Sequence, residues 1–290
     1  KRTDTVAINF EQVNFSYGAG TTLAQPILHD INVTIPDGQV TAIIGQTGSG
    51  KSTFIQHLNG LLKPTTGRVV IDDFVLTSDL KEKNLTSLRA RVGMVFQFPE
   101  NQLFANTVLE DVMYAPINFG YAKADAEFAA KTALKQVNVS EELWDKSPFE
   151  LSGGQMRRVA MAGALASNPD IIVLDEPAAG LDPKGQKELL AIVRGLKEAG
   201  KLVVFISHQM DHVIAVADHV IVMHDGGVVA EGTPVEIFNK DLVWFKTVAL
   251  DLPKAGQFAE QLRQKGHILR HRPLLLTELA TMLNEEKRHE

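Results

Sequence analysis

The chain has 290 residues, of which 44% are hydrophobic, and it carries no cysteine and a formal net charge of −6. A chain of this size can bury a large core and can hold more than one domain. The acidic balance argues against a nucleic-acid-binding surface, because phosphate recognition normally leaves a basic footprint. The lack of cysteine excludes a disulfide framework and a thiolate metal site, which suits a reducing compartment.

The hydropathy pattern gives no sign of a membrane-spanning segment. The longest apolar runs, such as residues 202–206, are far shorter than the roughly 18 residues that a span needs. Lys1 and Arg2 are not followed by an apolar stretch, so we expect no signal peptide at this start. Any membrane role is therefore expected to depend on partner proteins.

Short β-branched runs alternate with helical patterns, which is typical of an α/β domain with a mostly parallel sheet. The run Val40–Ile44 predicts a buried strand that leads directly into a glycine-rich loop. Behind this loop, Phe54, Ile55, Leu58 and Leu62 recur at helical spacing on one face. Further strands are predicted at Val69–Ile71, Val92–Phe96, Ile171–Leu174, Leu202–Ile206 and Val220–Met223.

Helical patterns replace the strands in the middle of the chain. Between about residues 97 and 166 they include Ala122–Val137 and Gln155–Ala166, which predicts a helical insertion in the α/β core. Further on, Gly226 and Gly227 indicate a turn between two short strands.

The last part of the chain contains two short amphipathic segments. Pro253 is expected to open one helix that Gly266 closes, and Thr277 is expected to cap the other. Two such segments are too small to bury a core of their own. Their apolar positions are Phe258, Leu262, Leu279, Met282 and Leu283.

The glycine-rich loop fits the phosphate-binding pattern G-x-x-x-x-G-K-[ST]. Glycines let the backbone N–H groups turn inward, and the N-terminus of the next helix adds a partial positive charge. Lys51 is predicted to reach the β- and γ-phosphates of ATP, and Ser52 to ligate Mg²⁺. A glycine-rich turn with an accidental Gly-Lys-Ser is disfavoured, because a buried strand precedes the loop and an amphipathic helix follows it. The predicted phosphate-binding residues are Gly45, Gln46, Thr47, Gly48, Ser49, Gly50, Lys51, Ser52 and Thr53.

Two carboxylates follow the apolar strand Ile171–Leu174, at the edge where α/β sheets place their ligands. Asp175 is predicted to hold the Mg²⁺ shell, and Glu176 to orient and polarise the attacking water. The alternative is a pair of solvated acids at a strand end, which the preceding phosphate loop makes less attractive.

The run Leu151-Ser152-Gly153-Gly154-Gln155 stands between these two motifs. With them it makes the chain resemble the ATP-binding-cassette (ABC) ATPases. The resemblance implies a P-loop core with a RecA-like, mostly parallel sheet, an antiparallel β subdomain, a helical subdomain and a small C-terminal helical domain. We expect the cassette to occupy residues 1–232, with the helical subdomain at about 97–166, and a dimerisation domain to occupy 233–290.

The same resemblance assigns roles to three single residues. It implies that His208 contacts the γ-phosphate, that Gln97 couples Mg²⁺ and the attacking water to the helical subdomain, and that Tyr17 stacks on adenine. Stacking on an aromatic ring tolerates any base. Taken alone, a histidine is more often structural and an aromatic residue in a strand more often belongs to the core.

In the resembled family two subunits pack head to tail, so the active species is expected to be a dimer. Each nucleotide lies between the P-loop of one subunit and residues Ser152, Gly153, Gly154 and Gln155 of the other. Asp182 matches the D-loop that communicates across this dimer. The C-terminal segments are expected to hold the two ATPases together between turnovers, and the alternative is that they only pack on their own core.

Two stretches, Gln56–Pro64 and Phe98–Phe104, narrow the resemblance to the A′-type ATPases of energy-coupling-factor (ECF) transporters. That implies ATP hydrolysis that drives uptake of vitamins or other micronutrients. The implied partners are a second ATPase, a transmembrane T component and substrate-binding S components, without nucleic acid. The family pairs two paralogous ATPases, and the sequence itself leaves open whether the partner is a paralogue or a copy of this chain. The implied location is peripheral, on the cytoplasmic face of the cell membrane, with membrane contact only through partners.

In this family the T component carries short Ala-Arg-type motifs, so Glu100 is expected to be its acidic contact. The alternative for Glu100 is an ordinary solvated loop acid. The alternatives for the whole chain are an ATPase of another importer, for ions or amino acids, and a soluble ABC ATPase of iron–sulfur assembly. The transported substrate is not written in this sequence.

Overall fold

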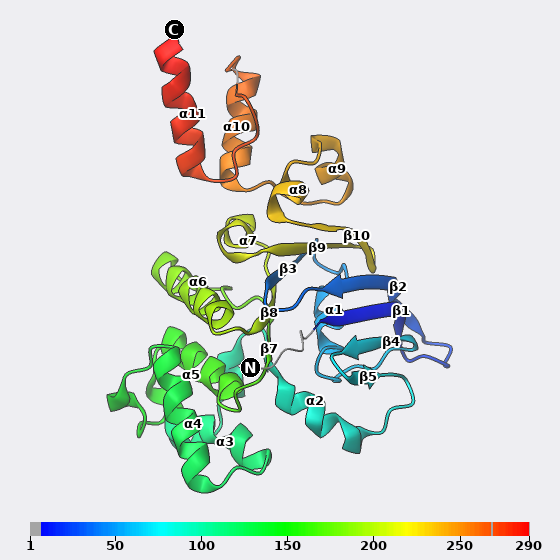
Figure 1. Cartoon of the computed structure of the whole chain (residues 1–290), viewed down its shortest axis with the longest axis vertical. Coiled ribbons are helices and arrows are strands. Elements are labelled where there is room, and N and C mark those ends of the chain that lie inside the picture. Colours follow the sequence, from blue (N-terminus) through cyan, green and yellow to red (C-terminus); the bar gives the residue numbers. More distant parts are fainter. Residues whose placement is uncertain (1–6, 268, 290) are drawn as a thin grey trace.

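Two β-sheets and a layer of helices organise the part of the chain that the computed structural model describes, residues 7–267 and 269–289 (Figure 1). Within those residues, no helix has both the length and the apolar character that crossing a membrane requires.

The larger sheet has six strands in the order β10-β9-β3-β8-β7-β6, and all are parallel except β10. Every residue of β3, β7 and β8 is buried, as expected for central strands of a parallel sheet that is covered on both faces. The strands that the sequence predicts for this sheet are present, with ends that differ by at most one residue. Their bounds are β3 Val40–Ile44, β6 Val92–Val95, β7 Ile171–Leu174, β8 Leu202–Ile206, β9 His219–His224 and β10 Gly227–Gly232.

The smaller sheet is antiparallel, with the order β2-β1-β4-β5, which confirms the antiparallel subdomain. Its inner face packs against α1 (Lys51–Gln56), where the rings of Phe10 and Phe54 stack 4.1 Å apart. Because α1 directly follows the glycine-rich loop, this packing holds the loop in place. The strands are β1 Ile8–Tyr17, β2 Gln25–Ile35, β4 Thr66–Ile71 and β5 Phe74–Leu76.

The first helix is shorter than the apolar pattern predicts. It ends at Gln56, and Leu58 and Leu62 lie in the turns that follow. Gly60 has a left-handed backbone with φ of 69°, which is incompatible with a continuing α-helix. Leu58 nevertheless remains fully buried in the core under the smaller sheet. Its apolar character therefore indicates that the position is buried, and does not indicate that it is helical.

Helices fill the segment between β6 and β7, as predicted, and Figure 1 shows them grouped beside that end of the larger sheet. The main helices there are η2 Pro99–Gln102, α3 Val108–Asn118, α4 Lys123–Gln136 and α5 Gly153–Leu165. The larger sheet is also accompanied by α2 Leu85–Arg91, α6 Pro183–Glu198 and α7 Met210–Val216.

The C-terminal region divides into two parts. The first part, α8 (Pro234–Phe238) and α9 (Leu242–Thr247), contributes buried side chains to the larger hydrophobic core. The second part, α10 (Lys254–Gln264) and α11 (Leu276–His289), has a small apolar cluster of its own. In Figure 1 these two helices stand away from the sheets, at the far end of the molecule.

One detail of the predicted C-terminal helices is wrong, the cap at Thr277. Helix α11 begins at Leu276, so Thr277 lies inside it and does not cap it. Phe258 is 51% exposed, because Ala255 and Ala259 are the residues of α10 that face inward.

Candidate active site

The glycine-rich loop connects the end of β3 to the start of α1 at the carboxyl edge of the larger sheet. At Gly45, a Cβ atom would lie 2.2 Å from the carbonyl oxygen of Met223, so no other residue fits this close approach. The turn between β9 and β10 supports the loop from the side, because Gly226 N–H donates to the carbonyl of Ser49 at 3.3 Å. The loop is therefore held at its two ends by β3 and α1 and from the side by the turn between β9 and β10.

Lys51 curls back onto this loop. Its Nζ donates to the carbonyls of Gly45 at 2.9 Å and Gln46 at 2.8 Å, and the side chain is buried. Burial lowers the pKa of Lys51, against the opposing attraction of Glu176 and Asp175. The predicted phosphate-binding lysine thus lies within electrostatic reach of both predicted catalytic-site carboxylates.

Asp175 lies at the end of β7 with only 7% of its surface exposed. Burial raises the pKa of its carboxyl, and the hydrogen bond from the Ser52 hydroxyl opposes that rise. Its backbone N–H donates to Val95 O at 2.8 Å, which places it beside the end of β6 and hence near Gln97. Ser52 and Asp175, predicted to share a metal ion, are therefore in contact.

Glu176 receives contacts from both of the other predicted catalytic residues. His208 Nε2 lies 2.9 Å from its Oε1, and Gln97 Nε2 donates to its Oε2 at 3.4 Å. Its backbone is left-handed, with φ of 48°, a conformation that is uncommon for residues other than glycine. Such strain persists where the surrounding structure over-determines the residue, and it is often found at functional sites.

Tyr17 is the last residue of β1 and does not belong to the buried core. Its ring meets Phe15 edge-on with 4.9 Å between centroids, and 43% of the residue remains exposed. Among the described contacts none joins Tyr17 to the glycine-rich loop, so its stacking role stays a prediction.

The run Ser152–Gln155 forms the start of α5 in the helical layer. Ser152 Oγ accepts from Gln155 N at 3.3 Å and Gln155 Oε1 accepts from Ser152 N at 2.9 Å, which is a capping box. Figure 1 shows α5 well apart from α1, and no hydrogen bond among the described residues joins residues 151–155 to 45–53. The structure therefore does not bring these two motifs together within one chain.

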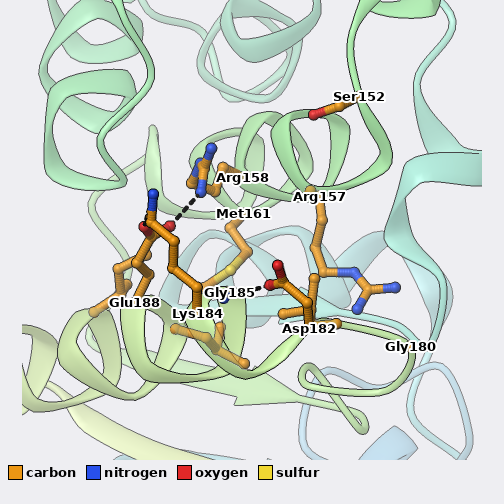
Figure 2. A pocket seen from close by; sticks show the side chains of 13 residues that line it. Ser152, Arg157, Arg158, Met161, Gly180, Asp182, Lys184, Gly185 and Glu188 are labelled. Carbon is orange, nitrogen blue, oxygen red and sulfur yellow. Dashed lines mark hydrogen bonds and ion pairs between the residues drawn. The ribbon is translucent and has the colours of Figure 1, made fainter.

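A cavity of about 360 Å³ lies between α5 and α6, next to this cap. Asp182 lines it and caps α6 by accepting from Gly185 N at 2.7 Å, so Ser152 and Asp182 share one side of the molecule (Figure 2). The ion pair between Arg158 and Glu188, 2.7 Å long, crosses the same cavity.

Glu100 is not the solvated loop acid of the alternative, and its contact with a T component stays a prediction in which that partner would compete with an internal one. Its carboxylate is paired with Arg157 of α5, at 3.1 Å between Nη2 and Oε1 and 3.3 Å between Nε and Oε2. Arg157 is not among the residues that the sequence predicts for the site. Two consecutive arginines on a helix point in different directions, and no local signal shows which of them is buried.

The fold and this site together define an ATP-binding cassette. A family model described as "ABC transporter" matches residues 28–179. The chain is 99% identical over 285 residues to the energy-coupling factor transporter ATP-binding protein EcfA2 of Leuconostoc mesenteroides, covering 98% of this chain and 100% of that protein. It is 50% identical to the EcfA2 protein of Lacticaseibacillus paracasei, over 95% of this chain and 96% of that one.

Solved structures agree with this assignment. CbiO1 from Clostridium perfringens, part of the ABC transporter complex cbiONQ, superposes with a TM-score of 0.74 at 36% identity, over 89% of this chain and all of that one. A dimeric ATP-binding cassette in a post-hydrolysis state with bound ADP and Pi gives 0.70 at 33% identity, over 78% of this chain and 98% of that one. The chain therefore belongs to the ABC transporter family, and within it to the A′-type ATP-binding subunits of energy-coupling-factor transporters.

Proposed function

We propose that this chain binds and hydrolyses ATP to energise an ECF-type importer of vitamins or other micronutrients. The observation that carries the proposal is the convergence at one sheet edge of Lys51, Ser52 with Asp175, and Glu176 with its two partners. The names and high identity of the relatives support transport as the purpose of this hydrolysis.

Each group at this edge has a definite task. The loop amides and Lys51 hold the phosphates, and Tyr17 stacks on adenine. Glu176 orients and polarises the attacking water, since its carboxylate is a hydrogen-bond acceptor held by two neighbours. His208, now on Glu176, reaches the γ-phosphate when nucleotide is bound.

Mg²⁺ fits the residues present. Ser52, Asp175 and Gln97 supply hard oxygen donors, and the buried Asp175 carboxyl, whose pKa burial raises, gains from a nearby cation. Among the described residues there is no cluster of three or more His, Cys, Asp or Glu that could hold a metal alone, which suits an ion that shares its ligands with substrate phosphates. When bound, Mg²⁺ neutralises charge on the β- and γ-phosphates.

The separation of α5 from the P-loop supports a head-to-tail dimer. Each nucleotide then lies between the loop of one subunit and Ser152–Gln155 of its partner, with Asp182 on the same face. We propose that the partner is a paralogous ATPase, and that the pair sits on the cytoplasmic face of the cell membrane against a T component that drives S components.

The exposed aromatic rings beside η2 support a docking site for the T component at this surface. Phe98 and Phe104 are 46% and 59% exposed, and Phe104 meets Tyr114 edge-on at 4.8 Å between centroids. Because the Glu100 carboxylate already has an internal partner, we assign the main docking contact to these aromatic side chains.

Copurification from detergent-solubilised membranes tests this function. We expect a tagged chain to bring down a second cassette and a multi-span membrane protein, with ATPase activity that Glu176→Gln removes. Copurification with a soluble scaffold and no membrane protein would overturn the transport assignment, while activity in the Glu176→Gln complex would overturn the site.

A further inference from the structure

The guanidinium of Arg157 joins three segments of the chain. Besides Glu100 in η2, it contacts two backbone carbonyls of the loop that follows Glu176, those of Pro177 and Ala179. Arg157 itself belongs to α5, two residues after Gln155. Figure 2 shows Arg157 leaving α5 toward the loop near Gly180, whereas Arg158 turns to Glu188.

The contact between Arg157 and Glu100 is largely buried, and every nitrogen of the guanidinium takes part in a hydrogen bond. The side chains of Arg157 and Glu100 are 7% and 20% exposed. The Nε and both Nη groups all donate, two of them to the carboxylate and Nη1 to the two carbonyls. A planar guanidinium can serve a carboxylate and two carbonyls at once, and a lysine ammonium cannot reproduce that fork.

Each joined segment carries a group of the proposed reaction. Gln97 lies three residues before Glu100, Glu176 directly precedes Pro177, and Ser152 caps the helix that bears Arg157. The Arg157 side chain therefore links α5 directly to the loop that follows Glu176 and to the helix that follows Gln97.

We propose that Arg157, with Glu100, is a positioning residue that makes hydrolysis depend on the placement of α5 relative to the Glu176 loop. Its described hydrogen-bond partners are Glu100 and the carbonyls of Pro177 and Ala179, so it acts through the segments that carry Gln97 and Glu176. The pair is thus needed for turnover but not for ATP binding at the P-loop. This inference rests on the proposed function.

The test compares four variants of the complex purified from membranes: Arg157→Met, Arg157→Lys, Glu100→Gln and the double variant Arg157→Met/Glu100→Gln. Arg158→Met is the matched control, since Arg158 is the next residue of α5 and also forms an ion pair. The measurements are kcat, KM for ATP, equilibrium ATP affinity and melting temperature. Wild type and Glu176→Gln are run alongside, so that a failure of the proposed function is seen separately.

Arg157→Met is expected to lower kcat at least about tenfold while ATP affinity stays within about threefold, the split that marks loss of an interaction needed after binding. Arg157→Lys keeps the charge, and we expect a lower kcat with little change in melting temperature. The double variant should be no slower than Arg157→Met, because coupled residues are not additive.

Three results would overturn the proposal. One is wild-type kcat in folded Arg157→Lys and Arg157→Met. Another is a loss of ATP affinity equal to the loss of kcat, which indicates a general structural role. The third is an equal loss in Arg158→Met. If Arg157→Met does not assemble, Arg157→Lys and Glu100→Gln decide, since both keep the size of the side chain.

Discussion

Glu176 carries the most specific prediction at the scale of a single residue. Glu176→Gln keeps the shape of the side chain but removes one of two acceptor oxygens and the charge that we propose polarises the attacking water. We expect hydrolysis to be abolished and ATP binding retained, at a cost of several kcal/mol in the barrier, where each 1.36 is about tenfold in rate. Turnover and nucleotide binding measured on the same sample check this, and an ATP-bound closed dimer should accumulate. Wild-type turnover in this variant would refute the role of Glu176.

Lys51 is expected to act one step earlier, in binding. Lys51→Ala removes the buried ammonium that we propose meets the phosphates, so ATP affinity itself should fall, because a charge-assisted contact is lost. Equilibrium binding of ATP measures this, with Lys131→Ala at a partly exposed position of α4 as the control. Unchanged affinity in Lys51→Ala would count against the P-loop assignment.

His57 predicts a pH dependence of stability. Burial lowers its pKa to about 4, Nδ1 lies 2.8 Å from the carbonyl of Thr53, and Nε2 is buried without a hydrogen-bond partner in the described part of the chain. In the unfolded chain His57 has an ordinary pKa near 6.5. Between about pH 6.5 and pH 4 it is therefore protonated in the unfolded chain and neutral in the folded chain. The contribution of His57 to the free energy of unfolding is therefore fully present above about pH 6.5. It falls as the pH drops toward 4, by about 1.36 kcal/mol per pH unit and by up to about 3 kcal/mol in total.

Denaturant unfolding at pH 7 and pH 5 isolates this contribution. His57→Leu should show a smaller loss of stability between the two pH values than wild type, because it lacks the proton uptake. His29→Asn, at an exposed position of β2, is the control and should keep the wild-type difference. An identical pH difference in wild type and His57→Leu would contradict the prediction.

At the scale of elements, local patterns predicted the central strands well and the irregular parts poorly. Strands β3, β7 and β8 are uninterrupted apolar runs, which a sheet covered on both faces requires. The end of α1 was missed because Leu58 remains buried after the helix stops. Burial alone does not distinguish a helix from the compact turns that follow it.

The site shows the same division between local and tertiary information. The motif residues could be predicted to meet because strand ends of a parallel sheet share one edge. The pairing of Arg157 with Glu100 joins positions 57 residues apart and depends on how α5 packs against η2. No local pattern contains that information, and the same is true of the exposed position of Phe258 on α10.

Arg272 is expected to attach the last two helices to the rest of the molecule. Its Nη1 donates to the carbonyls of Phe238 at 2.8 Å and Lys240 at 2.7 Å, and its Nε lies 3.3 Å from Glu260 of α10. The side chain is 10% exposed, so Arg272→Met leaves buried acceptors without donors, at about 1–3 kcal/mol. We expect faster amide hydrogen exchange in residues 254–285 with little change in the two sheets. Arg270→Met, at an exposed position, is the control.

At the scale of the whole molecule, the packing indicates that the C-terminal pairing unit begins later than residue 233, where the sequence places it. Ile237, Phe238 and Phe245 are buried in the larger core, so α8 and α9 cannot be removed without opening it. Within the described residues, a separate small cluster lies under α10 and α11 only, and these helices with the segment between them leave Phe258, Leu275 and Leu276 half exposed. We propose that the part that pairs two ATPases begins after about residue 253.

Truncation separates pairing from folding. A chain that ends at Pro253 keeps the larger core and should bind ATP, but it should no longer pair with its ATPase partner in the absence of nucleotide. A chain that ends at Gly232 loses Ile237, Phe238 and Phe245, and should be destabilised by several kcal/mol, because each large buried side chain that is lost costs about 2–5. Sedimentation or light scattering with and without ATP measures pairing, and nucleotide binding shows that the body is folded. Unchanged pairing of the chain that ends at Pro253 would show that α10 and α11 serve only their own chain.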